Sequence, residues 1–121
     1  MKSEIKYLHS PDVYELSSFS SIKPDNFGFL IQVMVGIEGE GGEESFDIML
    51  CTPKWIEENY KKERFILGLH YIIMFEYNYQ LLYNKLQELF CIEGKDWEEI
   101  ATKLSYIGHW EFQDYQEYIE E

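Results

Sequence analysis

Basic residues are scarce in this chain. Ten Lys and Arg stand against 23 Asp and Glu in 121 residues, so the formal net charge is −13. A surface with so few cations repels the phosphates of nucleic acids and anionic membranes, and we expect neither as a direct partner. The same charge attracts basic proteins at long range, although acidity alone also serves solubility. The composition therefore favours a basic protein partner without identifying one.

Cysteine is also rare, and long apolar runs are missing. Cys51 and Cys91 show neither metal-ligand spacing nor a CxxC pattern, and both lie in apolar stretches, which predicts buried, reduced thiols. No stretch reaches the roughly 18 apolar residues that a membrane-spanning helix needs. The segment Met1–Tyr7 lacks the apolar core of a signal peptide. We therefore expect a protein of the cytoplasm, a reducing compartment.

Familiar catalytic and phosphate-binding motifs are absent from the sequence. It contains no GxxxxGK[ST], GxGxxG, GxSxG or HExxH pattern, and His9, His70 and His109 are far apart without metal-like spacing. The closeness of His109 and Glu111 leaves open an acid–base enzyme, but a packed corner after the last helix explains them better. Paired glutamates favour a solvated face over a metal site. We predict no catalytic residue, no metal and no cofactor.

What the chain has in quantity is aromatic and apolar side chains. Hydrophobic residues make up 45% of the sequence and aromatic residues 17%, which excludes a disordered acidic tail. The length suits one domain with a substantial hydrophobic core. We therefore predict a single domain over residues 1–121.

Periodicity predicts four strands. Ile5 and Tyr7 alternate with polar residues, and residues 27–35 are apolar on both faces, which indicates a central strand covered by a helix. The glycine-rich segment Glu38–Glu44 predicts a tight reversal into a hairpin partner. The predicted strands are residues 2–7, 27–35, 45–51 and 69–77.

Three helices follow from capping residues and apolar stripes. Thr52 and Pro53 form a strong helix start, and Asp96 with Glu99 resembles a capping box. The predicted helices are residues 53–60, 78–91 and 97–107, the last ended by Gly108. This order predicts an α+β fold, with a mostly antiparallel sheet of about four strands and helices packed on one face.

Acidic residues concentrate in two segments that we predict to bind a partner. One is the Glu38–Glu44 loop, and the other is the C-terminal tail Glu111–Glu121, where tyrosines alternate with acids and no base occurs. Charges steer an encounter and tyrosines supply contact area, although the tail aromatics could also dock on the core. The candidate contact residues are Glu38, Glu40, Glu43, Glu44, Glu111, Asp114, Tyr115, Glu117, Tyr118 and Glu120.

Several strings resemble the bacterial immunity protein 8 family. They are residues 25–29 (DNFGF), 42–47 (GEESFD), 51–55 (CTPKW), 96–99 (DWEE) and 103–115 (KLSYIGHWEFQDY), in order over about three quarters of the chain. CTPKW and the GHWEF part of the last string are specific because they contain rare residues. The resemblance thins over residues 13–23 and 60–66.

The resemblance implies a cytoplasmic protein that binds and neutralises the C-terminal domain of a secreted polymorphic toxin. Many such toxin domains are nucleases, so the implied partner is a basic domain. The family contributes no catalytic residue; Phe46, Pro53, Trp55, Trp97 and Trp110 match its strings but suit core and cap positions. The alternative is an acidic nucleic-acid mimic or interaction module that binds a basic host protein. The oligomeric state is not predicted.

Overall fold

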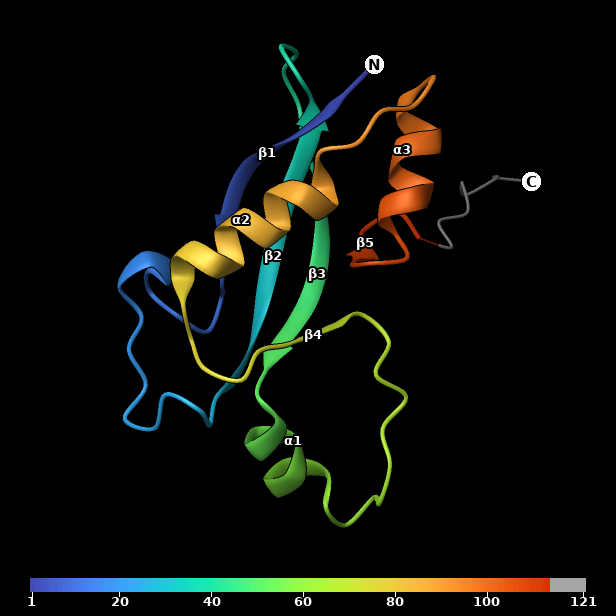
Figure 1. Ribbon diagram of the computed structural model, residues 1–121. Helices are drawn as coiled ribbons and strands as arrows, with labels where there is room; N and C mark the ends of the chain where they lie inside the picture. The colour runs from blue at the N-terminus through green and yellow to red at the C-terminus, as the bar shows by residue number, and fades with distance from the viewer. Residues whose placement is uncertain (114–121) are drawn as a thin grey trace, which may run out of the picture.

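The computed structural model describes residues 1–113 of the chain. These residues form five strands, three α-helices and one short 3-10 helix, which Figure 1 shows in chain order. The elements are β1 (Ser3–His9), a 3-10 helix η1 (Leu16–Ser18), β2 (Gly28–Ile37), β3 (Glu44–Cys51), α1 (Pro53–Tyr60), β4 (Tyr71–Ile73), α2 (Tyr79–Phe90), α3 (Trp97–Leu104) and β5 (His109–Trp110).

The strands form one open sheet in the order β1-β2-β3-β4, with β5 also paired to β3. β1–β2, β2–β3 and β3–β5 are antiparallel, whereas β3 and β4 run parallel. The parallel pair arises because α1 and the segment after it carry the chain back before β4 begins. Two strands therefore pair with the same outer edge of β3. β5 pairs with Phe46–Asp47, and β4 pairs with Met49–Cys51. The α+β prediction with a mostly antiparallel sheet is confirmed.

The predicted β2–β3 hairpin is present. Gly28 pairs with Cys51 and Val35 with Glu44 across an antiparallel ladder. Gly39 and Gly42 in its loop have φ values of +80° and +95°, which glycine adopts without steric cost. At Gly36 a side chain would meet the loop, since an added Cβ would lie 2.3 Å from the carbonyl oxygen of Gly42.

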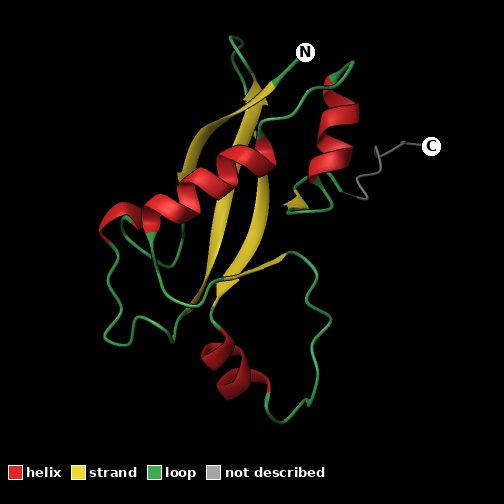
Figure 2. Ribbon diagram, viewed as in Figure 1, coloured by secondary structure: helices red, strands yellow, loops and turns green. Residues whose placement is uncertain are grey.

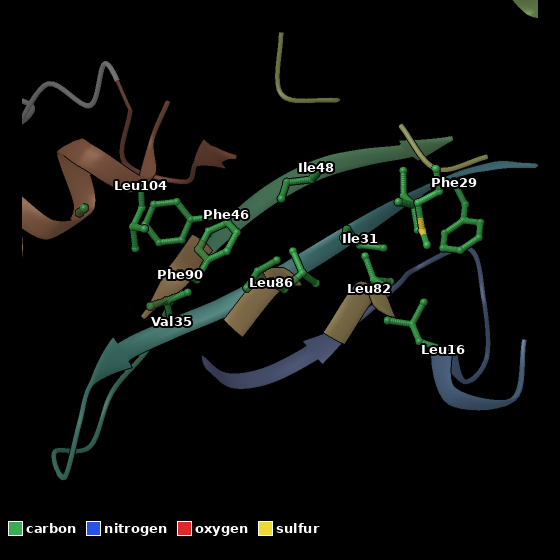
Figure 3. Close-up of a cluster of buried hydrophobic side chains, with 14 of the residues drawn as sticks. Leu16, Phe29, Ile31, Val35, Phe46, Ile48, Leu82, Leu86, Phe90 and Leu104 are labelled. Atoms are coloured by element: carbon green, nitrogen blue, oxygen red, sulfur yellow. The ribbon is translucent and has the colours of Figure 1, made fainter. Parts of the chain in front are cut away.

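The hydrophobic core lies between one face of the sheet and the helices α2 and α3. Figure 2 shows α2 crossing that face, with α3 beside it. Alternate residues of β2 and β3 point into this layer, as their period-two pattern predicts. Figure 3 shows the packed side chains, which include Leu16, Phe29, Ile31, Val35, Phe46, Ile48, Leu82, Leu86, Phe90 and Leu104.

The first strand departs from its predicted alternation. The pairing of Ile5 with Val35 is followed by that of Tyr7 with Met34, so Lys6 is an extra residue in β1. This bulge reverses the faces beyond it, because the side-chain period along a strand is two. Leu8 therefore packs against the core, and Tyr7 is 59% exposed, whereas alternation had placed Tyr7 with Ile5.

The helix starts follow their capping residues. The side chain of Thr52 accepts a hydrogen bond from the Trp55 amide, and Asn78 and Asp96 cap α2 and α3 in the same way. The carboxylate of Glu99 accepts a hydrogen bond from Lys103 Nζ at 3.1 Å. The last helix ends at Leu104, earlier than predicted, and a turn leads into β5, a strand that sequence reasoning missed.

The N-terminus is fastened to the end of α2. Ser3 is buried, its hydroxyl donates to the carbonyl oxygen of Phe90 at 2.6 Å, and it accepts from the amide of Ile92 at 2.9 Å. The Ser3 amide donates in turn to the Ile92 carbonyl oxygen at 2.9 Å. These bonds join residues almost ninety positions apart.

The two tryptophans predicted as core residues lie in different layers. Trp97 is half-buried and packs against the core, with its ring 6.5 Å from that of Phe46. Trp55 is also half-buried but covers Gly28, where an added Cβ would lie 2.3 Å from Trp55 Cδ2. Gly28 alternates with Phe29, whose side chain is in the core, so Trp55 lies on the opposite side of the sheet.

Candidate binding surface

The acidic residues of the hairpin loop are positioned for contact. Glu38, Glu40 and Glu43 are exposed, and Glu44 is half-buried at the start of β3. Of the predicted tail residues, Glu111 falls within residues 1–113. The others, Asp114, Tyr115, Glu117, Tyr118 and Glu120, lie outside the described residues.

β5 brings the start of the tail to the hairpin. The Glu111 carboxylate accepts from the Ser45 amide at 2.7 Å, and the Glu111 amide donates to the Ser45 carbonyl oxygen at 3.1 Å. Trp110 Nε1 donates to Glu44 Oε1 at 3.0 Å, and the Trp110 ring stacks on Phe46. Two segments that the sequence separates by almost seventy residues therefore form one acidic surface. Glu44 and Glu111 also help to hold β5 against β3.

A cavity of about 550 Å³ opens on this surface, and we call it the acidic pocket. Its lining includes Glu40, Glu43, Glu44, Glu111, Trp97 and Phe112. Trp97 lines the pocket, but its Nε1 is buried and has no hydrogen-bond partner among residues 1–113. Carboxylates gathered around a concave surface suit the ammonium or guanidinium group of a basic side chain.

The side chain of Lys6 is a cation that hydrogen-bonds the hairpin loop. Its ammonium group bonds the carboxylate of Glu4 and donates to the carbonyl oxygen of Glu40 at 2.7 Å. The hydrogen bond from Lys6 lowers the pKa of Glu4. Lys6 is thus engaged by Glu4 and by a backbone oxygen, and the hairpin carboxylates keep their charge available to a partner.

The sheet has a second surface of interest, on the side opposite α2 and α3, which we call the open face. Of the described helices, α1 alone reaches this side, through Trp55 at one end of β2. Alternation along the paired strands places the following side chains on this face: Tyr7, His9, Leu30, Gln32, Met34, Ser45, Asp47, Met49, Tyr71 and His109. None of them is fully buried.

One transverse row of the open face is entirely polar. The register pairs His9 with Gln32, Gln32 with Asp47, and Asp47 with His109, across four strands. Asp47 Oδ1 is buried and has no hydrogen-bond partner within the described part of the chain. The rows beside it contain Tyr7 with Met34, and Leu30 with Met49. Sequence reasoning placed Asp47 in a predicted strand but did not align it with the other three residues.

An apolar groove lies on the helix side of the sheet, between β4 and α2. Its volume is about 610 Å³, and its lining includes Met74, Phe75, Leu81, Leu82, Leu86 and Leu89. Phe75 is 79% exposed and Leu81 49%, which is a high exposure for large apolar residues that lie together.

The histidines and cysteines make other contacts. The His70 ring lies 5.6 Å from that of His109, and His70 Nε2 hydrogen-bonds the Ser105 carbonyl oxygen at 2.8 Å. Both cysteines are free; burial raises the pKa of Cys51 to about 11, and Cys91 Sγ donates to Gln87 Oε1.

Within residues 1–113, no group of three or more histidine, cysteine or acidic side chains is placed to hold a metal ion. In the same part of the chain, no helix has the length and apolarity to cross a membrane.

Comparison with known protein families identifies the class to which this chain belongs. The family model for Immunity protein 8 matches residues 3–115, which is most of the chain. The chain is therefore a member of the Immunity protein 8 family, as its sequence strings indicated. No curated protein and no solved structure matches it.

Proposed function

We propose that this protein is a cytoplasmic immunity protein that binds the C-terminal toxin domain of a secreted bacterial polymorphic toxin. We further propose that it acts by occupying that domain, with no turnover of its own, and that the toxin domain is a basic nuclease. The observation that carries the proposal is the Immunity protein 8 match over residues 3–115. The net charge of −13 supports a basic partner.

The acidic surface offers a physical route to fast neutralisation. Glu38, Glu40 and Glu43 project from a loop at one end of the sheet, and the acidic pocket lies beside them. A local concentration of one charge sign raises the association rate with an oppositely charged protein by about 10-fold to about 1,000-fold at low salt. An inhibitor that must reach its toxin before the toxin reaches its substrate benefits from such steering.

The test is association kinetics with the C-terminal toxin domain that this proposal expects to be encoded beside this gene. The variant Glu38→Gln/Glu40→Gln/Glu43→Gln removes three exposed charges and leaves Glu44, which holds Trp110, in place. We expect this variant to associate about 10-fold more slowly at low ionic strength. The difference should shrink between roughly 0.01 M and roughly 0.15 M salt, because the screening length falls from about 30 Å to about 8 Å.

The matched control is Glu57→Gln/Glu58→Gln/Glu63→Gln. It removes the same charge from exposed positions on α1 and the segment that follows it. Equal slowing by both variants would assign the effect to net charge and not to the hairpin. If the wild-type protein fails to bind the neighbouring toxin domain and instead captures a basic host protein, the nucleic-acid-mimic alternative replaces the immunity function.

A further inference from the structure

The open face contains a half-buried carboxylate, one oxygen of which the described residues leave without a hydrogen bond. Asp47 lies in the middle of β3, between Phe46 and Ile48, whose side chains are fully buried on the opposite face. Asp47 Oδ1 is buried without a hydrogen-bond partner. A buried polar oxygen without a hydrogen bond is destabilising, so such an oxygen is uncommon at the centre of a sheet. Because Asp47 as a whole is half-buried, part of its side chain remains open on this face to a donor that comes from another molecule.

The neighbours of Asp47 define which donor fits. Gln32 and His109 face it from the adjoining strands, and Gln32 adds a second group with an acceptor oxygen. His9 ends the row beyond Gln32, and its ring stacks on that of Tyr7 at 5.2 Å. A guanidinium group is planar, carries several N–H donors, and stacks on aromatic rings, so it matches acceptors set between ring systems better than an ammonium group does.

The rest of the open face suits a protein contact around that charge. Met34 lies diagonally across from Asp47 on β2, Met49 lies two residues along β3, and Leu30 and Tyr7 extend the apolar surface. Methionine adapts to irregular partner surfaces, and a charged pair at an interface gains strength when apolar contacts exclude water around it. The hairpin acids stand at one end of the same sheet and add to its negative potential.

We propose that the open face is the docking surface for the toxin domain, and that Asp47 there binds the guanidinium group of a toxin arginine. This inference rests on the proposed immunity function and assigns its central contact. It differs from the acidic pocket in kind: the hairpin carboxylates are exposed and steer the encounter, whereas Asp47 is half-buried in the sheet face, loses its remaining water on docking and holds the complex.

The experiment compares Asp47→Asn with Glu88→Gln in binding to the neighbouring toxin domain. Both variants remove one negative charge, but Glu88 is exposed on α2, across the sheet from the open face. Removing one partner of a buried interfacial charge pair weakens binding by about 30-fold or more, and we expect this for Asp47→Asn, mainly as faster dissociation. Glu88→Gln should change the Kd by less than about 3-fold.

Two further measurements separate docking from folding. The melting temperature of Asp47→Asn should be unchanged or higher, because the substitution removes a half-buried charge whose Oδ1 no described residue bonds. Hydrogen exchange of the wild-type complex should show protection of residues 28–36 and 45–51.

The outcomes are distinct. Failure of the wild-type protein to bind the toxin domain would overturn the proposed function and this inference with it. If the wild type binds and Asp47→Asn matches Glu88→Gln, this inference alone is wrong. A marked loss of stability in Asp47→Asn would show that Asp47 serves the fold, and protection confined to residues 72–89 would move the docking site to the apolar groove.

Discussion

Replacing Gly28 with alanine tests how α1 is attached to the sheet. Gly28 does not have a positive φ, so the backbone accepts alanine, but the new Cβ would lie 2.3 Å from Trp55 Cδ2 and Cε2. Overpacking of this kind costs about 1–3 kcal/mol. The lower chain entropy of alanine in the unfolded state offsets about 0.5 kcal/mol of that. We therefore expect Gly28→Ala to lower the free energy of unfolding by about 0.5–2.5 kcal/mol.

A double-mutant cycle isolates the contact. In a Trp55→Ala background the space beside Gly28 is empty, so Gly28→Ala should be neutral or stabilising by about 0.5 kcal/mol. Gly41→Ala is the matched control, because nothing lies within 4 Å of its added Cβ and its φ is not positive. The assay is chemical denaturation followed by circular dichroism, at constant m value. Equal effects of Gly28→Ala in the two backgrounds would refute the packing of Trp55 on Gly28.

Two other predictions concern the core. Trp97→Ala should lower the free energy of unfolding, measured by chemical denaturation, by about 3 kcal/mol, because a packed aromatic ring is lost. Trp97→Phe should lower it by less than about 1 kcal/mol, because the buried indole N–H has no partner among the described residues and so no hydrogen bond is lost. Burial raises the pKa of Tyr77 to about 12, so the folded state holds this proton more tightly than the unfolded state does. The resulting stability is complete below about pH 10 and is lost as the pH rises through about 12. Tyr77→Phe loses the hydrogen bond to the Leu16 carbonyl oxygen and should therefore be less stable than the wild type by about 1 kcal/mol at about pH 8. Between about pH 8 and about pH 11, however, this variant should lose less stability than the wild type does, because it has no phenol to titrate.

Local chemistry predicted much of the fold. The hairpin followed from a glycine-rich turn between two apolar segments, and the starts of α1 and α3 followed from Thr52 and Asp96, whose side chains accept backbone N–H groups. These features depend on residues only a few positions apart. The faces of β2 and β3 were predictable for the same reason, since a strand buried on one side alternates strictly.

Features that depend on distant pairing escaped prediction. The bulge at Lys6 exists only in relation to β2, and β5 is too short to show a period of its own. The meeting of Glu111 with the hairpin depends on the β3–β5 pairing, so sequence reasoning treated one acidic surface as two. The polar row at Asp47 requires the registers of four strands at once.

The tie between Ser3 and the residues after α2 bears on how this protein is made. The hydrogen bonds of Ser3 cannot form until Phe90 and Ile92 have been synthesised, and β3 lacks part of its outer edge until Trp110 follows. Translation at about 5–20 residues per second makes that interval roughly 5–20 seconds for a chain of this length. Contacts this distant in sequence also slow folding itself. Under the proposed immunity function, a cell would benefit from a folded reserve of this protein, because chains started after a toxin arrives need that interval before they can fold completely.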